Sequence, residues 1–194
     1  MEITDKQLIE KFLKGNEPAF ELLLKKHLKS VYNFLCRLTI DKAAAEDLTQ
    51  ETFVKIWKNL HRYDNSKNFK VWLFAIAKNT AFDFLRKKKS LPFASFTNGS
   101  GYNKLEEISE DKIIPEEMLE REVLSGEIEK KLNKLPSLYK VILLLHYQDD
   151  FSLQEIAMIL ERPYNTIKSQ HQRALFRLKK TFLEDNASKK TSDP

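Results

Sequence analysis

Apolar residues in the first part of the chain recur every three or four positions, which is the period of an α-helix. Thr4 and Gln7 fit a capping box, in which each side chain pairs with a backbone N–H of the first turn. A short helix is therefore predicted from this point to Gly15, because glycine can end a helix in a left-handed conformation without strain. Asn16-Glu17-Pro18 predicts the start of a second helix, since proline is tolerated in a first turn, and its apolar stripe continues to about Leu38.

Two more helices are predicted before residue 90. Asp41 is a suitable N-cap for a helix from Lys42 to Leu60. Its expected inward-facing residues are Leu48, Ile56, Trp57 and Leu60. The polar segment 61–68 predicts a loop. The helix expected at 69–89 combines aromatic with cationic side chains, which suit the binding of unpaired bases and their phosphates, although an ordinary core also explains aromatic residues at helical spacing.

The clearest pattern lies in residues 151–180. Ser152 and Glu155 fit a second capping box at the start of a short helix, and Pro163 predicts the start of a longer one. In the longer helix one face holds Ile167, Ala174, Leu175 and Leu178, and the other holds Thr166, Ser169, Gln172 and Arg173. A short helix, a tight turn and a longer helix with a basic outer face are the parts of a helix-turn-helix, whose second helix lies in the DNA major groove. The alternative is a helical hairpin in an all-helical core with a solvated outer face.

Residues 90–118 differ in composition from the segments on either side. This stretch contains glycine, serine, asparagine and then many acidic residues, and it predicts a flexible acidic linker that is too polar to build a core. Helices resume from Leu119, with one stripe that Pro136 ends and a very apolar helix from Ser137 to Tyr147. The polar tail that begins at Glu184 is expected to be disordered.

The composition argues against several classes of protein. Four glycines and six prolines in 194 residues argue against an all-β fold, which needs many turns. The sequence has no run of about 18 apolar residues, so it predicts no transmembrane helix. The N-terminus lacks the features of a signal peptide, and we therefore expect a cytoplasmic protein. The single cysteine, Cys36, excludes an internal disulfide.

The net charge of +5 is distributed unevenly along the chain. Residues 1–90 hold 18 Lys or Arg against 11 Asp or Glu, residues 91–122 hold 3 against 8, and residues 123–194 hold 12 against 9. Two basic blocks around an acidic one suit binding to a polyanion, because neutralised phosphates release their counterions. A solvated charged surface explains the same counts equally well.

The chain shows no pattern that is typical of an enzyme or a metal site. It has no glycine-rich phosphate loop and no nucleophile with an arranged base. The four histidines are scattered, and with one cysteine they predict neither a metal nor another cofactor. His27 lies on an apolar helix face, where a hydrogen-bonded core histidine is expected rather than a ligand.

Several segments resemble one protein family. EIAMILERPYNTIKSQHQRALFRLK, residues 155–179, resembles region 4.2 of the extracytoplasmic-function (ECF) sigma factors of bacterial RNA polymerase, in which the -35 promoter element is read. AEDLTQETFVKIW, residues 45–57, resembles region 2.2 of that family, and NFKVWLFAIAKNTAFDFLRKKK, residues 68–89, resembles its regions 2.3 and 2.4. The segments come in the order that the family has, and the resemblance covers nearly the whole chain.

The resemblance implies a fold, a function and partners. The implied fold is all-α, with region 2 at residues 1–90, a flexible acidic linker at 91–118, region 4 with the helix-turn-helix at 119–184 and a disordered tail at 185–194. The implied function is that of a transcription initiation factor, which binds the clamp and flap of core RNA polymerase, recognises the -35 and -10 elements and promotes DNA melting. The family also implies an anti-sigma factor as partner. The alternative is a conventional helix-turn-helix regulator that binds DNA without core polymerase, which would need neither a clamp-binding patch nor a melting helix.

Residue by residue, the resemblance implies three sets of contacts. The contacts to core polymerase would be Asp47, Gln50 and Glu51. The -10 element would be bound by a base-capture loop, residues 65–69, and the helix after it, through Asn65, Ser66, Lys67, Asn68, Phe69, Lys70, Trp72, Lys78, Asn79, Asp83 and Arg86. The -35 element would be bound by Asn165, Thr166, Lys168, Ser169, Gln170, Gln172, Arg173 and Arg177.

The segment that would read the -35 element departs from the family pattern at four positions. Glu161 and Asn165 stand where glycines are usual. Gln170 replaces a common arginine, and His171 takes a usually apolar place on the inner face. Glutamine and asparagine prefer adenine through paired hydrogen bonds in the major groove. Asn165, Gln170 and Gln172 therefore indicate -35 sites that contain adenine.

Overall fold

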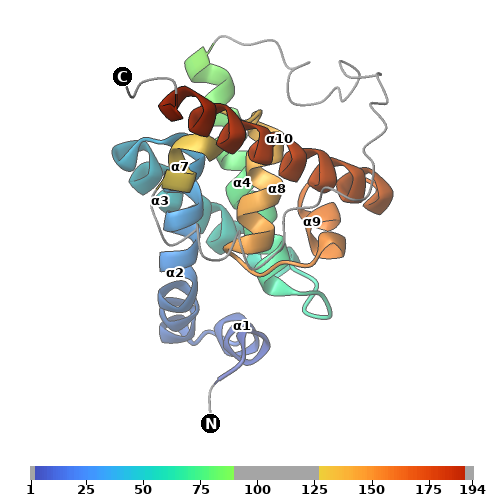
Figure 1. The fold of residues 1–194 in the computed structure, drawn as a ribbon. Helices are drawn as coiled ribbons and strands as arrows, with labels where there is room; N and C mark the ends of the chain where they lie inside the picture. Colours follow the sequence, from blue (N-terminus) through green and yellow to red (C-terminus); the bar gives the residue numbers. More distant parts are fainter. Residues whose placement is uncertain (1–2, 90–126, 191–194) are drawn as a thin grey trace. The chain divides into compact units, whose positions relative to one another are not determined.

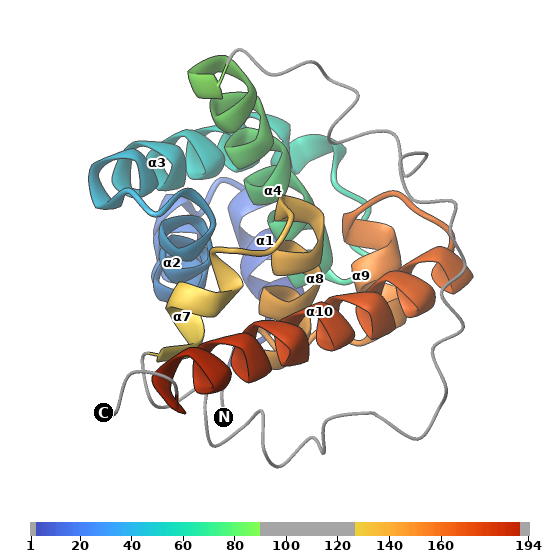
Figure 2. The same cartoon turned by 45° about the horizontal axis from the view of Figure 1, so that its top comes forward.

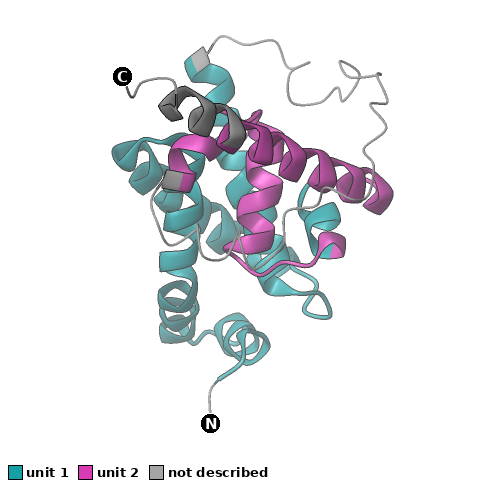
Figure 3. Cartoon of the chain, viewed as in Figure 1, with its two compact units in different colours: residues 1–91, 155–161 teal, residues 92–154, 162–194 magenta. Residues whose placement is uncertain are grey.

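The computed structural model describes the backbone of residues 3–89 and 127–190 and the side chains of residues 3–88 and 128–182. Every regular element in these ranges is a helix (Figure 1), which confirms the predicted all-α class. The chain divides into two compact units (Figure 3). Unit 1 comprises residues 1–91 and 155–161, and unit 2 comprises residues 92–154 and 162–194.

Helix α1, Asp5–Leu13, begins at the predicted capping box. The Gln7 N–H donates to Thr4 Oγ1 at 3.3 Å, and the Thr4 N–H donates to Gln7 Oε1 at 3.0 Å. Both N–H groups lack a partner within the helix, so the two side chains stabilise its start. Gly15 follows the helix with a φ of 91°, a conformation that would strain a residue with a side chain.

Helix α2, Glu17–Thr39, packs against α1. Asn16 caps it as predicted, because Asn16 Oδ1 accepts a hydrogen bond from the Ala19 N–H at 3.2 Å. The helix ends at Ile40, which has a left-handed conformation with a φ of 59°. The Ile40 side chain is 64% exposed, so it contributes little to the core.

Helices α3, Lys42–Asn59, and α4, Phe69–Lys89, complete the helical framework of unit 1. Asp41 caps α3 as predicted, accepting from the Ala44 N–H at 3.1 Å. A short 3-10 helix, η1, Leu60–Arg62, follows α3 and leads into the loop before α4. The boundaries of α4 agree with the sequence prediction of a helix at 69–89.

The core of unit 1 lies where α2, α3 and α4 pack against one another (Figure 2). Phe34 of α2 and Phe74 of α4 are fully buried, with ring centres 5.4 Å apart. Ile56 of α3 is also fully buried, as predicted. The prediction for Trp57 is wrong, because its side chain is 55% exposed. Consecutive residues of a helix lie about 100° apart around its axis, so Trp57 points away from the core that Ile56 enters.

Unit 2 is built on α8, Ser137–Tyr147, and α10, Tyr164–Lys190, with the short helix α7, Glu127–Leu132, packed on α10. Helix α8 matches the predicted apolar helix, and its residues 139–145 are all buried. The predicted inner face of α10 is confirmed by four buried side chains, Ile167, Ala174, Leu175 and Leu178. Helix α9, Leu153–Ile159, precedes α10 in the chain.

Parts of the predicted domain organisation fall outside these helices. The predicted linker at 91–118 lies outside the described residues. Helix α10 continues to Lys190, through the first part of the segment predicted as a tail, and residues 191–194 lie outside the described part. The domain boundaries stay a prediction. Within the ranges that the structure describes, no helix has both the length and the apolar character needed to cross a membrane.

His171 lies on the inner side of α10 beside two residues of α8. Its ring centre is 4.9 Å from that of His146 and 5.7 Å from that of Tyr147. His171 Nε2 is buried and has no hydrogen-bond partner among the described residues. Burial disfavours the charged imidazole, and the charge of His146 adds to this effect, so the pKa of His171 falls to about 4.

Substituting Ile40 by glycine should stabilise unit 1. A β-branched residue rarely has a positive φ, and the left-handed conformation costs about 1 to 2 kcal/mol for a residue with a Cβ. Glycine also gives the unfolded chain more freedom, which offsets part of this gain, so Ile40→Gly should raise the free energy of unfolding by about 0.5 to 1 kcal/mol in urea denaturation. Ile40→Val keeps the branch and the positive φ and should give no gain. A lower free energy of unfolding for Ile40→Gly would show that the backbone of Ile40 is not strained.

The low pKa of His171 predicts a loss of stability in mild acid. The unfolded chain, with an ordinary histidine pKa of 6.5, binds this proton more readily than the folded protein, so stability is lost as the pH falls from 6.5 toward 4. At pH 5 the loss should reach about 2 kcal/mol. We expect urea unfolding at pH 7 and pH 5 to show this loss in the unsubstituted chain and in the exposed-site control His61→Gln, but not in His171→Leu. The same pH dependence in His171→Leu would rule out this ring as the cause.

Candidate nucleic-acid interface

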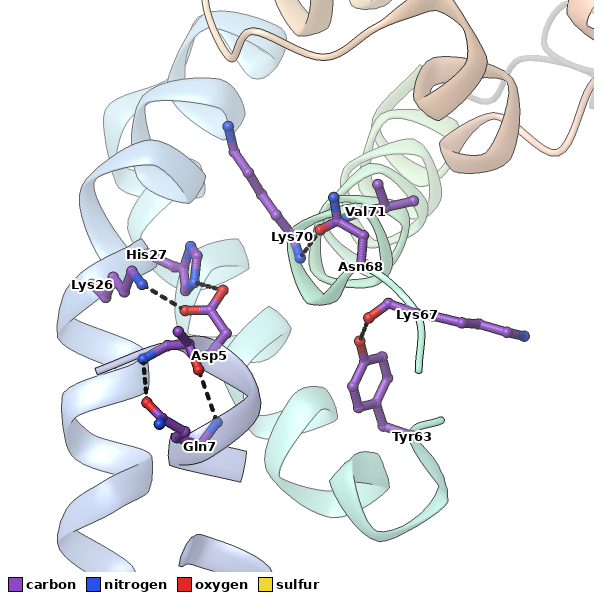
Figure 4. Close-up of polar contacts among 10 residues, drawn as sticks. Asp5, Gln7, Lys26, His27, Tyr63, Lys67, Asn68, Lys70 and Val71 are labelled. Carbon is purple, nitrogen blue, oxygen red and sulfur yellow. Dashed lines mark hydrogen bonds and ion pairs between the residues drawn. The ribbon is translucent and has the colours of Figure 1, made fainter. Parts of the chain in front are cut away.

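The loop between η1 and α4 is held by its own hydrogen bonds. The Tyr63 hydroxyl donates to the carbonyl oxygen of Lys67 at 2.5 Å, which joins the two ends of the loop (Figure 4). The Ser66 N–H and hydroxyl both donate to Asp64 Oδ1, at 3.0 and 2.7 Å. These hydrogen bonds lower the pKa of the Asp64 carboxyl. The loop backbone is therefore fixed while the side chains of Ser66 and Lys67 stay exposed.

Asn68 ends this loop and caps helix α4. Its Oδ1 accepts hydrogen bonds from the Lys70 N–H at 2.9 Å and the Val71 N–H at 3.4 Å (Figure 4). At the other end of the predicted capture loop, Asn65 Nδ2 donates to Glu10 Oε1 of α1 at 3.2 Å. The predicted loop residues are thus brought together, with both ends tied to a helix.

An aromatic cluster packs where the loop joins α4. Phe69, the first residue of α4, is 4% exposed. Its ring centre lies 5.6 Å from that of Tyr63, 5.9 Å from that of Trp72 and 5.5 Å from that of His27. The Tyr63 and Trp72 rings lie 4.8 Å apart. Phe69 therefore supports the loop from the core, whereas Trp72 is half-buried and keeps part of its surface accessible.

The other predicted -10 residues occupy different faces of α4. Asn79, Asp83 and Arg86 are exposed at helical spacing, and Arg86 Nη2 lies 3.0 Å from Asp83 Oδ1. Lys70 is half-buried, and Lys78 is only 6% exposed. The structure therefore groups the first three residues on one accessible surface and does not bring Lys78 onto it.

Helix α3 presents an exposed face that is part acidic and part apolar. Asp47, Gln50 and Glu51 are all exposed. Val54 and Trp57 continue the same face at helical spacing and are 48% and 55% exposed. Sequence reasoning missed this apolar part. The spacing could have shown it, because Val54 follows Gln50 by four residues and Trp57 follows Val54 by three.

The outer face of α10 carries most of the predicted -35 residues. Asn165, Lys168 and Gln172 are exposed, and Thr166, Ser169, Arg173 and Arg177 are partly exposed. Ser169 Oγ donates to the Thr166 carbonyl at 2.9 Å. The Arg177 guanidinium lies 5.5 Å from the centre of the Tyr139 ring of α8, which orients its side chain.

Gln170 differs from these residues because its side chain is buried. It is 7% exposed, and its Oε1 has no hydrogen-bond partner among the described residues. Ile167 and Ala174, three residues before it and four after it, are fully buried, so Gln170 shares the apolar face of α10. In this conformation Gln170 does not reach the surface that would meet a base edge.

The turn before α10 has the conformation that a glycine usually provides. Glu161 has a φ of 53°, and the Leu160 N–H before it still donates to the Ile156 carbonyl at 2.9 Å. The Pro163 carbonyl accepts from the Thr166 N–H at 3.0 Å, which begins the first turn of α10. Glu161 therefore adopts this backbone conformation without a glycine.

The groups that these surfaces offer are suited to binding. In the ranges described by the structure, no three His, Cys, Asp or Glu side chains lie close enough together to hold a metal ion. The exposed groups are amides, hydroxyls, cations and aromatic rings, which suit hydrogen bonding, phosphate contact and base stacking.

Two family models match this chain. The sigma-70 region 2 model matches residues 23–91, and the sigma-70 region 4 model matches residues 125–178. The ECF RNA polymerase sigma factor SigW of Bacillus subtilis (strain 168) is 32% identical over 186 residues, which cover 95% of this chain and 100% of SigW. SigM, an ECF RNA polymerase sigma factor of the same organism, is 34% identical over 158 residues, which cover 80% of this chain and 90% of SigM.

Solved structures share the fold. The structure of CnrH in complex with the cytosolic domain of CnrY matches 93% of this chain and 98% of the CnrH chain, with a TM-score of 0.69 and 20% identity. The sigma factor RpoE from Bartonella quintana, solved with the anti-sigma factor NepR, matches 83% of this chain and 94% of RpoE, with a TM-score of 0.61 and 24% identity. From the two matched regions and the similarity to SigW along its whole length, we conclude that the chain belongs to the ECF sigma factors of the sigma-70 family.

Proposed function

We propose that this chain is a transcription initiation factor, not an enzyme, that binds core RNA polymerase and directs it to promoters. It recognises the -35 and -10 elements and promotes DNA melting. The observation that carries the proposal is the similarity to an ECF RNA polymerase sigma factor over 95% of this chain. Such a factor binds polymerase, duplex DNA and an unpaired strand, and the described residues offer a separate surface for each.

The proposed polymerase surface is the exposed face of α3. Asp47, Gln50 and Glu51 supply two charges and an amide, which suit a basic partner helix. Val54 and Trp57 supply exposed apolar area beside them. Protein interfaces combine an apolar centre with a polar rim, and tryptophan is enriched among the residues that contribute most to affinity. We therefore include both residues in the polymerase contact.

The proposed -10 surface is the capture loop with the exposed side of α4. Extruding a base costs a few kcal/mol, which the protein must offset by contacts to the unstacked base. A loop with a fixed backbone and exposed polar side chains can make such contacts without ordering itself first. Asn65, Ser66, Lys67 and Asn68 would hold the base, and Trp72 lies beside them as a stacking surface. Asn79, Asp83 and Arg86 would meet the adjoining DNA.

The proposed -35 surface is the outer face of α10. Lys168, Arg173 and Arg177 would contact phosphates or guanine, and Thr166 and Ser169 would support the docking. Gln172 and Asn165 are exposed and would read adenine. We leave Gln170 out of this set because it is buried, so the preference for adenine now depends on the other two amides.

Two further properties complete the proposal. Family membership implies regulation by an anti-sigma factor and action in the cytoplasm, where bacterial RNA polymerase works. The alternative, a regulator that binds DNA without core polymerase, is not favoured, because the chain matches both region 2 and region 4 of the sigma-70 family.

In vitro transcription with purified core RNA polymerase on a pool of genomic promoters tests the proposed function. We expect defined transcripts that require this chain. Asp47→Ala/Glu51→Ala should reduce them about tenfold, because losing about 1.4 kcal/mol of binding free energy weakens assembly by that factor. Glu21→Ala/Glu46→Ala also removes two exposed carboxylates from unit 1 and should leave the transcripts unchanged. If the chain binds duplex DNA by itself and never redirects polymerase, the proposal is wrong.

The salt dependence of binding to -35 duplex DNA tests the role of α10. Each phosphate contact contributes about 0.9 to the slope of log affinity against log salt concentration. If Lys168 contacts a phosphate, Lys168→Ala in the holoenzyme should lower the slope by about that amount and weaken binding to all sequences alike. Lys25→Ala, at an exposed position of α2, is the control. An unchanged slope in Lys168→Ala would remove this lysine from the interface.

A further inference from the structure

Helix α1 contacts the capture loop, although the matched region 2 model begins only at residue 23 and the sequence analysis assigned no contact residue to α1. Glu10 Oε1 of α1 accepts the hydrogen bond from Asn65 Nδ2 of the loop at 3.2 Å. The two residues are 55 positions apart in the sequence. The contact is exposed, so by itself it contributes only modestly to stability.

A second route from α1 to the loop runs through His27. Asp5 Oδ2 of α1 lies 2.9 Å from His27 Nε2 of α2, and Asp5 Oδ1 forms an ion pair with Lys26 Nζ at 2.9 Å (Figure 4). Burial alone would raise the pKa of Asp5, but the hydrogen bonds and charges of His27 and Lys26 together lower it to about 2. Asp5 is therefore ionised at neutral pH, and it accepts a hydrogen bond from the His27 ring, which fixes the orientation of that ring.

The fixed His27 ring contacts Phe69, and Phe69 supports the loop. The His27 side chain is only 8% exposed, and the two ring centres lie 5.5 Å apart. Phe69 in turn contacts Tyr63 at 5.6 Å, and the Tyr63 hydroxyl holds the Lys67 carbonyl. Asp5, His27, Phe69 and Tyr63 thus form a continuous series of contacts from α1 to the loop backbone.

We propose that Asp5 and His27 are positioning residues for the capture loop, and that α1 is the element that orders this loop for -10 recognition. The proposal rests on the proposed function of residues 65–69. Neither residue needs to touch DNA in this role. Asp5 orients the His27 ring, the ring holds Phe69, and Phe69 with Tyr63 holds the loop in the conformation that receives a base. A loop that is ordered before binding loses less conformational freedom when the base enters, which raises affinity for the unpaired strand.

The experiment uses the full chain in holoenzyme with core RNA polymerase. The probe is a single-stranded oligonucleotide that carries the -10 sequence of a promoter selected with the unsubstituted holoenzyme, with 2-aminopurine at the captured position. His27→Ala and the milder Asp5→Asn are compared with Val31→Ala, which also shortens a buried side chain of α2, one turn further along the helix. Amide hydrogen exchange of residues 64–68 is measured on the same variants, together with binding to a -35 duplex.

We expect His27→Ala to weaken binding of the -10 oligonucleotide about tenfold and Asp5→Asn to weaken it by a smaller factor. Exchange in residues 64–68 should accelerate in both variants, while binding to the -35 duplex changes less than twofold. Val31→Ala should lose stability without either effect. Equal losses of oligonucleotide binding in His27→Ala and Val31→Ala, or unchanged loop exchange in His27→Ala and Asp5→Asn, would overturn the proposal.

A loop variant separates failure of this proposal from failure of the proposed function. Ser66→Ala/Lys67→Ala changes the exposed side chains of the loop and leaves the contacts of α1 in place. If this variant binds the -10 oligonucleotide normally, residues 65–69 are not the capture loop and the proposed function of this segment is wrong. If this variant loses binding while His27→Ala and Asp5→Asn retain it, only the positioning role of α1 is wrong.

Discussion

Phe69 is buried against Tyr63, Trp72 and His27. The position of the polar loop against the helices of unit 1 depends on this contact. Each aromatic pair adds about 0.5 to 1.5 kcal/mol beyond the burial of its area. The cluster lies at the point where a loop with few apolar groups of its own must be placed against a helical core. Because Phe69 is also the first residue of α4, the same contact fixes the start of that helix and the end of the loop.

Most of the helical framework could be predicted from the sequence, because its determinants are local. Thr4, Asn16 and Asp41 each stand where a first helical turn needs an acceptor, and the structure gives each of them that role. The spacing of apolar residues then identified the buried face of α10, and the continuous apolar run identified α8 as a buried helix. Capping and amphipathic spacing involve residues within about two turns of each other, so a single sequence contains the information.

The parts that could not be predicted depend on contacts between distant residues. Trp57 follows a core residue in a helix with apolar side chains on more than one face, so spacing alone did not decide whether it is buried. Gln170 is polar but lies between two buried apolar residues one turn away on either side, whereas the family resemblance had made it a -35 contact. The Glu10 to Asn65 contact joins residues 55 positions apart and arises only once the helices have packed. The Tyr63 to Lys67 hydrogen bond lies within an irregular loop, to which no helical spacing applies. The functional assignments of the loop and α3 came from the family resemblance, and that of α10 came from the helix-turn-helix pattern together with the resemblance. All three stay predictions.

Within the described ranges, a positive φ occurs at three residues other than glycine, and each of them follows a helix. They are Ile40, Asp150 and Glu161. Glycine would remove the steric cost at every one of these positions. Substitutions at these helix ends could therefore stabilise the fold without changing the faces that pack in the core. Cellular proteases act on the unfolded fraction of a protein, and a change of 1 to 2 kcal/mol alters its abundance about severalfold. Glycine at these three positions would therefore lower the unfolded fraction and slow the removal of the protein by proteases.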